Sequence, residues 1–196
     1  MIDLKFRNAG VDDIPALVAL VTSAYRGDVS RQGWTTEADF LDGSRIDPGV
    51  LRHDIERPRS RVLIAGLRHA QGLTHTRSGD EPRRPESKML ACAHVSEEDG
   101  AGYFGMFSVQ PGLQGGGVGK ALLAESERVI REDWRLPAMR MTVIDIRDEL
   151  IAFYERRGYH RTGIYKPFPY GDARFGIPKR DDLRFEVLEK HLEDPA

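Results

Sequence analysis

The stretch VQPGLQGGGVGK, residues 109–120, places five glycines between two segments of regular structure. The run YFGMFSV at 103–109 predicts a strand before it, and GKALLAESERVIRE at 119–132 predicts a helix after it. Glycine costs about 0.5–1 kcal/mol relative to alanine inside regular structure. Five glycines at one joint therefore indicate positive φ angles or the close approach of another group, and the alternatives are a plain loop and a phosphate cradle.

A glycine-rich turn between a strand and a helix is suited to binding an anion, because backbone N–H groups and the positive end of the helix dipole meet there. The Walker A pattern fails, since Gln114 stands at its first glycine and Ala121 at its final Ser/Thr. The dinucleotide pattern Gly-x-Gly-x-x-Gly fails as well, because Lys120 stands at the third glycine when Gly115 and Gly117 are aligned. Nucleoside triphosphates and dinucleotides are therefore disfavoured as ligands.

The pattern Gln/Arg-x-x-Gly-x-Gly does match, over residues 114–119. Here the chain resembles the GNAT superfamily of acetyl-CoA-dependent N-acyltransferases, in which this pattern forms the pyrophosphate loop. The strand ending FSVQP at 107–111 is similar to the bulged family strand that pairs with the pantetheine arm. A second family signature is similar to RDELIAFYERRGY at 147–159. The residues in register there are Tyr154, Glu155, Arg156, Gly158 and Tyr159.

The resemblance implies an N-acetyltransferase that uses acetyl-CoA as co-substrate. The residues that it implies in cofactor binding are Phe107, Ser108, Val109, Gln114, Gly115, Gly116, Gly117, Val118, Gly119, Lys120, Arg147 and Arg156. For Lys120 and Arg156 a solvated helix surface is an equal alternative. The chain departs from the family at two points. Arg147 stands where many members have asparagine, and the strand YFGMFSV lacks the carboxylate that several members use as a general base.

Acyl transfer to an amine requires a polarised carbonyl, a neutral amine and a proton for the departing thiolate. Backbone N–H groups near Val109 are suited to polarising the carbonyl. Tyr154 is the candidate acid, because phenol and thiol have similar pKa values of about 10 and 8.5. The candidate bases are Glu37 and His94, and a water chain is an equal alternative. No Cys or Ser stands where an acyl-enzyme would need it, so we expect direct attack by a primary amine in a ternary complex.

Acceptor recognition in the family comes from the segment between the first two helices and from loops near the carboxy terminus. The corresponding segments here are SRQGWTTEADF and KPFPYGDARFG. Tyr25, Trp34 and Tyr170 are the candidate walls of a pocket for a small-molecule or peptide amine, and covering the edge of the core is an equal alternative for each. A function of another class is a non-catalytic acyl-CoA-binding sensor or regulatory module, which would use the same loop without turnover.

The predicted elements follow the order β-α-α-β-β-β-α-β-α-β-β, which indicates an α/β fold with a mixed six- to seven-stranded sheet flanked by helices. Three successive strands favour an antiparallel meander, and the strand, helix, strand unit at 103–146 favours a parallel crossover. Asp47 followed by Pro48 predicts the start of one helix, and the capping-box pattern of Thr36 with Asp39 predicts another, short one.

Residues 1–196 are expected to form a single acyltransferase domain. The interval at 70–87 is rich in Gly, Pro, Ser and mixed charge without periodicity, which predicts a flexible hairpin loop. Residues 166–196 are expected to hold a C-terminal loop and the last strand.

Charge and composition argue against several classes of function. The formal net charge is −2, and the basic residues are scattered among acidic ones, so nothing favours nucleic acid. No apolar run approaches the ~20 residues that span a bilayer, and the amino terminus lacks a secretory signal. The single cysteine, Cys92, lies in an apolar run and predicts a small buried thiol in a reducing cytoplasm. No His or Cys pair has metal-site spacing. The sequence does not decide between a monomer and a homodimer.

Overall fold

The structure is a computed structural model that describes residues 3–26, 30–31, 36–67, 88–172 and 176–192. The loop predicted at 70–87 and the candidate residue Trp34 lie outside these ranges. The strands are β1 (Leu4–Asn8), β2 (Leu41–Asp42), β3 (Ser60–Leu67), β4 (Met89–Glu98), β5 (Ala101–Val109), β6 (Ala138–Ile144), β7 (His160–Pro167), β8 (Ile177–Pro178) and β9 (Arg184–His191). The helices are α1 (Ile14–Tyr25), α3 (Pro48–Glu56), α4 (Val118–Arg128) and α5 (Asp148–Glu155), with a 3-10 turn η1 (Val11–Asp13) and a π-helical turn η2 (Val129–Asp133).

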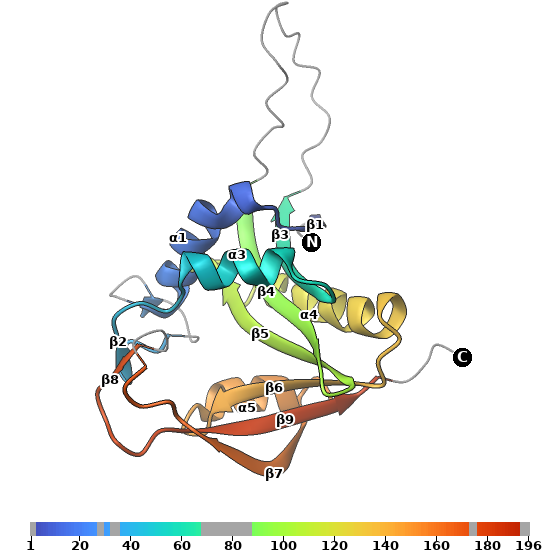
Figure 1. Ribbon diagram of the computed structural model, residues 1–196. Helices are drawn as coiled ribbons and strands as arrows, with labels where there is room; N and C mark the ends of the chain where they lie inside the picture. The colour runs from blue at the N-terminus through green and yellow to red at the C-terminus, as the bar shows by residue number, and fades with distance from the viewer. Residues whose placement is uncertain (1–2, 27–29, 32–35, 68–87, 173–175, 193–196) are drawn as a thin grey trace, which may run out of the picture.

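The described elements confirm the predicted α/β class and, apart from the two-residue strands β2 and β8, the predicted order. The large sheet has the strand order β1-β3-β4-β5-β6-β9-β7 (Figure 1). Strands β3, β4 and β5 form the predicted antiparallel meander, and β5 pairs with β6 in parallel through the α4 crossover. In the described residues, no helix is long and apolar enough to cross a membrane.

The sheet opens between β5 and β6. These two strands share the residue pairs Gly102↔Met139 and Tyr103↔Arg140 and then separate. In Figure 1, β3 and β4 reach toward the top of the molecule and β5 slants below them, whereas β6, β9 and β7 lie across the base of the molecule. A β-bulge contributes to the separation, because the register of β4 against β5 shifts between Cys92 and His94 and Met106 has a φ of 51°. The remainder of β5 therefore has an open edge toward β6.

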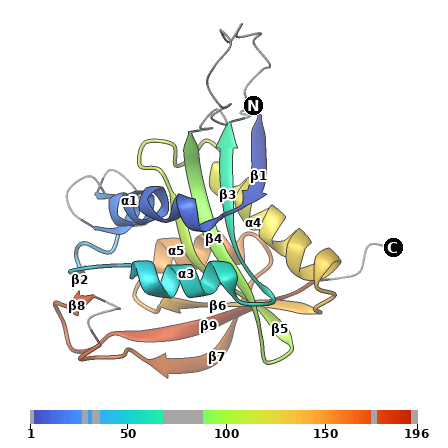
Figure 2. The same ribbon diagram turned by 45° about the horizontal axis from the view of Figure 1, so that its top comes forward.

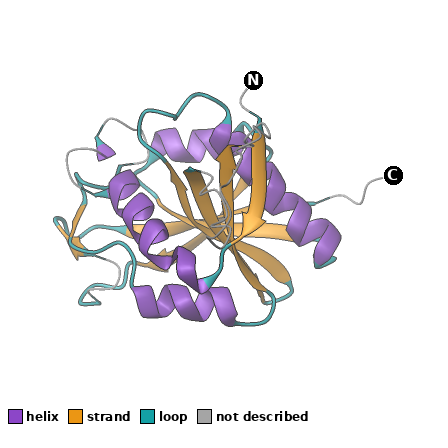
Figure 3. Ribbon diagram, turned by 90° about the horizontal axis from the view of Figure 1, so that it is seen from above, coloured by secondary structure: helices purple, strands orange, loops and turns teal. Residues whose placement is uncertain are grey.

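Helices cover both faces of the sheet. Helices α1 and α3 pack on one face, and α4 and α5 lie on the other (Figures 2 and 3). The alternation of strand residues follows this division: Val62 and Ile64 of β3 pack with α1 and α3, whereas Leu63 and Ala65 join the core beneath α4. Both faces of β3 are thus apolar because both are covered.

The start of α3 is the one that the sequence predicts. The Asp47 side chain accepts hydrogen bonds from the N–H groups of Gly49 and Val50, at 2.8 and 2.9 Å, and Pro48 occupies the first helical position. These bonds satisfy two of the N–H groups that have no partner inside the helix.

The prediction of a short helix that starts at Thr36 is wrong. Thr36 Oγ1 accepts from the N–H of Ala38, but the chain makes a single turn and then enters β2. Asp39, the expected partner in the capping box, pairs with Arg31 at 2.6 Å. A long-range pairing of β2 with β8 therefore prevails over the local helix signal.

Close packing where β5 and β6 meet makes Gly102 sensitive to substitution. A Cβ at Gly102 would lie 2.5 Å from two atoms of Ile130, whose side chain is fully buried. Because overpacking a core costs about 1–3 kcal/mol, we expect Gly102→Ala to lower the free energy of unfolding by that amount in urea denaturation. Gly10→Ala is the matched control, since that site is open and its φ is −108°. Equal stability of the two variants would contradict the packing of β5 against η2.

Candidate active site

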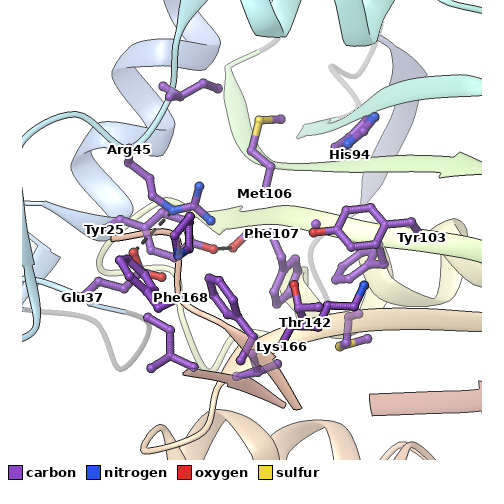
Figure 4. A pocket seen from close by; sticks show the side chains of 18 of the residues that line it. Tyr25, Glu37, Arg45, His94, Tyr103, Met106, Phe107, Thr142, Lys166 and Phe168 are labelled. Carbon is purple, nitrogen blue, oxygen red and sulfur yellow. Dashed lines mark hydrogen bonds and ion pairs between the residues drawn. The ribbon is translucent and has the colours of Figure 1, made fainter. Parts of the chain in front are cut away.

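A cavity of about 640 Å³ lies where β5 and β6 separate. Its walls come from α1, α3, β4, β5, β6 and α5 and from the segment after β7. Figure 4 shows Tyr25, Glu37 and Arg45 at one end of this cleft and His94 and Tyr103 at the other. Other lining residues are Asp54, Arg57, Glu98, Met106, Phe107, Arg147, Tyr154, Lys166 and Phe168.

The open edge of β5 presents peptide groups to the separation between the strands. The N–H of Gln110 donates to the carbonyl of Leu90 at 2.8 Å, so residue 110 faces β4. Because peptide direction alternates along a strand, Phe107 and Val109 point their N–H and C=O groups away from β4. The Tyr25 hydroxyl donates to the Phe107 carbonyl at 2.5 Å. Tyr25 thus lines the cleft and satisfies one of these groups.

The glycine turn needs its glycines for two different reasons. Gly115 and Gly117 have φ angles of 88° and 85°, a region that side chains disfavour. A Cβ at Gly119 would lie 2.9 Å from Phe107 Cζ, so Gly119 lets α4 approach β5 closely. Gly117 is the N-cap of α4 and provides no side-chain cap, which leaves the first N–H groups of this helix to a ligand or solvent.

The cleft lining given above does not include this turn. Two cationic residues predicted to contact the cofactor, Lys120 at the start of α4 and Arg156 after α5, are both exposed.

Tyr154 lies on α5 with its ring in an aromatic cluster. The ring centroids of Phe104, Phe107, Phe153 and Tyr159 are 5.3–6.4 Å from its own. Tyr154 lines the cleft, and among the described residues no group forms a hydrogen bond with its hydroxyl. Burial raises the pKa of Tyr154 far above the ordinary value of a phenol. The hydroxyl therefore carries its proton throughout the neutral range and is not committed to another protein group.

His94 forms a hydrogen-bonded pair with Ser60 on the neighbouring strand β3. The Ser60 hydroxyl donates its proton to the carbonyl oxygen of Asp54, 2.6 Å away, because a carbonyl can only accept. His94 Nε2, 2.9 Å from the same hydroxyl oxygen, must therefore be the donor in their contact. This assigns neutral His94 to the Nε2–H tautomer with its lone pair on Nδ1, and the described residues place no hydrogen-bond partner on Nδ1.

The electrostatic surroundings keep His94 neutral at physiological pH. Burial lowers the pKa of its imidazole below 6.5, an effect that the Asp54 carboxylate 3.8 Å from Nε2 partly offsets and Arg57 reinforces. His94 lines the cleft and is only 8% exposed.

Glu37 is the shared partner of three arginines. Its Oε2 atom lies 2.8 Å from Arg26 Nη1 and 3.4 Å from Arg45 Nε, and its Oε1 atom lies 3.1 Å from Arg147 Nη1. Burial alone would raise the pKa of Glu37, but the charges of Arg45, Arg147 and Arg26 outweigh it and hold the pKa below its ordinary value. Both carboxylate oxygens are thus engaged and ionised, which makes Glu37 a poor proton acceptor at neutral pH.

Two predicted site residues lie in unexpected places. Arg147, predicted to contact the cofactor, belongs to the buried ion cluster of Glu37 and lies on the wall of the cleft. Tyr170 is 44% exposed, and its hydroxyl accepts the N–H of Leu183 at 2.7 Å, so it stabilises the loop without lining the cleft. Its neighbour Phe168 is the aromatic residue that reaches the cavity.

Sequence reasoning missed Tyr103 and Arg45. Tyr103 lies in the strand before the glycine turn, and its ring covers Gly105, where a Cβ would meet the ring at 2.8 Å. Gly105, two positions after Tyr103, was a sequence signal that could have indicated an aromatic ring lying across the strand. Arg45 follows a turn-rich segment, and nothing in the local sequence distinguishes this partly buried arginine from the exposed ones.

Comparison with known proteins agrees with this geometry. Residues 83–161 match the family model described as acetyltransferase (GNAT) domain. This match covers about two fifths of the chain and supports the GNAT superfamily. The match supports an N-acetyltransferase whose general reaction is acyl transfer. No curated protein matches the chain in sequence.

Solved GNAT structures share the fold at low identity. Ard1 from Thermoplasma volcanium has 15% identity and a TM-score of 0.65, covering 98% of this chain and 100% of that one. The ribosomal-protein-S18-alanine N-acetyltransferase from Escherichia coli has 14% identity and a TM-score of 0.62, with 98% and 96% covered. A Bacillus anthracis structure in complex with acetyl coenzyme A has 15% identity and a TM-score of 0.52, with 72% and 67% covered.

Removing the charge of Glu37 should destabilise the folded protein. Removing one partner of a buried ion pair costs about 3–5 kcal/mol, because the remaining charges stay buried. We therefore expect Glu37→Gln to lower the free energy of unfolding by about 3 kcal/mol at neutral pH in urea denaturation. Glu56→Gln, which removes an exposed carboxylate 3.5 Å from Arg52, is the control and should cost less than about 1 kcal/mol.

The stability difference between wild type and Glu37→Gln should depend on pH. A carboxyl whose pKa is lowered in the folded state stabilises the protein above its unfolded pKa, and the stabilisation is lost as pH falls through the folded value. The difference between wild type and Glu37→Gln should therefore be full at neutral pH and shrink below the ordinary value of 4.5. A difference that grows in acid would contradict an ionised Glu37.

Proposed function

We propose that this GNAT domain transfers the acetyl group of acetyl-CoA to a primary amine that binds in the cleft between β5 and β6, by direct attack in a ternary complex. The observation that carries the proposal is the Tyr154 hydroxyl, which lines the cleft, keeps its proton and has no hydrogen-bond partner among the described residues. Because the hydroxyl is accessible from the cleft and is not engaged by a described protein group, it is available to a bound ligand.

The residues around the opening fit acetyl-CoA. The uncapped N-terminus of α4, with Gly115 and Gly117 at positive φ, offers backbone N–H groups to a pyrophosphate. The N–H of Phe107 and the peptide groups of Val109 along the open edge of β5 suit the amide groups of a pantetheine arm, since Tyr25 already engages the Phe107 carbonyl. When bound, acetyl-CoA supplies an acetyl group activated as a thioester.

Tyr154 acts as the acid in this proposal. As the amine nitrogen bonds to the acetyl carbon, the carbon–sulfur bond breaks, and the electron pair that leaves with sulfur takes the Tyr154 proton. The raised pKa keeps the phenol protonated until that moment. Arg147, whose charge favours the phenolate, offsets part of the cost of its transient ionisation.

His94 acts as the base. The amine must lose a proton when it forms the amide, and the Nδ1 lone pair of neutral His94 accepts it. Glu37 is unsuited to this step because its carboxylate is held ionised between three guanidinium groups. The products are the N-acetylated amine and CoA thiol, while Tyr154 regains a proton from solvent and His94 releases one.

The proposal is tested first with purified protein. Acetyl-CoA should raise the melting temperature, and CoA thiol should appear when a panel of primary amines is added. Stabilisation by acetyl-CoA without thiol release across the panel would favour the alternative of an acyl-CoA-binding sensor. Neither stabilisation nor release would contradict acetyl-CoA as the co-substrate.

Loss of the Tyr154 hydroxyl should reduce turnover without weakening cofactor binding. General acid catalysis contributes about 10²–10⁴-fold, so Tyr154→Phe should lower kcat by about 10²-fold or more. The dissociation constant for acetyl-CoA, measured by calorimetry, should stay within about twofold, since phenylalanine keeps the ring packing. Tyr165→Phe, an exposed residue of β7, is the matched control. An unchanged kcat in Tyr154→Phe would remove the hydroxyl from the mechanism.

The pH profile should identify His94 as the base. Because burial lowers the pKa of His94, kcat under saturating substrates should fall only as pH drops through a value below 6.5. In His94→Gln this acidic limb should disappear and kcat should fall by about 10²-fold. Asp54 and Arg57 are the charged groups that bear on this imidazole, and both are unchanged in the variant. Persistence of the limb in His94→Gln would assign proton removal to water instead.

A further inference from the structure

Among the described residues, the arginine cluster at one end of the cleft carries more positive than negative charge. Arg26, Arg45 and Arg147 all pair with the single carboxylate of Glu37. Even without Arg147, the guanidinium groups of Arg26 and Arg45 share the single carboxylate of Glu37. Nη2 of Arg26 is buried without a hydrogen-bond partner. Excess charge in a partly buried site favours the binding of an anion.

Arg45 turns this charge toward the cleft. Its Nε atom lies 3.4 Å from Glu37, and its guanidinium carbon lies 4.8 Å above the centre of the Tyr25 ring. These contacts hold the base of the group, and Figure 4 shows its outer end pointing into the cleft. Within the described residues, no acceptor forms a hydrogen bond with Nη1 or Nη2 of Arg45. A planar pair of N–H donors is therefore presented to the cavity.

The acidic groups that the structure describes near Arg45 do not occupy this fork. Asp47, two residues along the chain, uses Oδ1 to cap α3 through Gly49 and Val50. Asp54 pairs with Arg57 at 3.3 Å near His94, at the other end of the cleft. The ionised group that acts on Arg45 is Glu37, which keeps the guanidinium charged. Arg45 thus faces the bound acceptor as a cation with two donors to offer.

We infer that the acceptor is a small amine bearing a carboxylate or phosphate group, and that Arg45 binds this group with its two terminal nitrogens. The inference rests on the proposed function, because it places the acceptor in the same cleft. Carboxylate and phosphate oxygens match the guanidinium fork in a bidentate arrangement. A cavity of about 640 Å³, shared with the reacting end of acetyl-CoA, suits a small acceptor.

The test compares acceptors that differ in one acidic group. Glycine, β-alanine and γ-aminobutyrate are each assayed against their carboxamides, and phosphoethanolamine against ethanolamine, with kcat/KM corrected for the fraction of neutral amine. Putrescine represents acceptors with a second cation. Wild type should prefer the acid of at least one pair by about 10- to 100-fold, the range of a charge-assisted hydrogen bond. Comparing the amino acid pairs with the phosphoethanolamine pair shows whether the Arg45 guanidinium binds a carboxylate or a phosphate.

Variants assign the preference to Arg45. Arg45→Gln should bring the ratio of acid to amide close to one, and Arg45→Lys, which keeps the charge but loses the fork, should retain part of the ratio. Arg52→Gln, on the exposed face of α3, should keep the full ratio. Thermal unfolding of each variant verifies that it is folded.

The outcomes separate this inference from the proposed function. Equal kcat/KM for acids and amides in wild type, a preference for putrescine, or an undiminished ratio in Arg45→Gln would overturn the inference and leave acetyl transfer intact. Thiol release with none of the amines, despite binding of acetyl-CoA, would contradict the proposed function and the inference together.

Discussion

Strands β5 and β6 pair through two residue pairs and then separate, and this break in the ladder determines where everything else lies. A parallel ladder that continued would hydrogen-bond the peptide groups of Phe107 and Val109 and leave no room for a cavity. The bulge at Met106 redirects β5 instead. Unpaired backbone groups inside a protein need other partners. Tyr25 satisfies the Phe107 carbonyl, and the remaining groups face the opening.

The two faces of the sheet contribute different parts of the site around this break. On the α4 side, Gly119 allows the helix to approach Phe107 closely, which carries the uncapped N-terminus of α4 to the end of the open edge. On the α1 and α3 side, Arg45 and Glu37 form a charged wall, and His94 stands beyond them. Tyr154 reaches the cleft from α5, on the α4 side of the sheet. The cofactor and the acceptor are thus expected to enter from opposite faces of the sheet.

The sequence predicts the elements well because their signals are local. Strand alternation, the Asp47 cap and the glycine turn each depend on residues within a few positions of one another. Thr36 and Asp39 show the limit of local signals. Arg31 forms an ion pair with the Asp39 carboxylate, and the strand that follows, β2, pairs with β8. Both partners come from tertiary structure.

The site was less predictable for the same reason. Glu37 was a reasonable candidate base by residue type, but Arg147 lies 110 positions along the chain, and the fold brings the two within 3.1 Å. No sequence pattern indicates that three arginines will surround one carboxylate and lower its pKa. Tyr154 was predictable because it belongs to a motif, whereas the tautomer of His94 depends on Ser60, 34 residues away on another strand.

A crystal structure of the protein with acetyl-CoA tests the central claim most directly. The account predicts that the pantetheine arm lies along β5 at Phe107 and Val109, with the thioester sulfur within about 3.5 Å of the Tyr154 hydroxyl oxygen. It also predicts the pyrophosphate at the N–H groups of residues 118–120. Acetyl-CoA bound away from the open edge of β5, or a Tyr154 hydroxyl that does not face the sulfur, would contradict it.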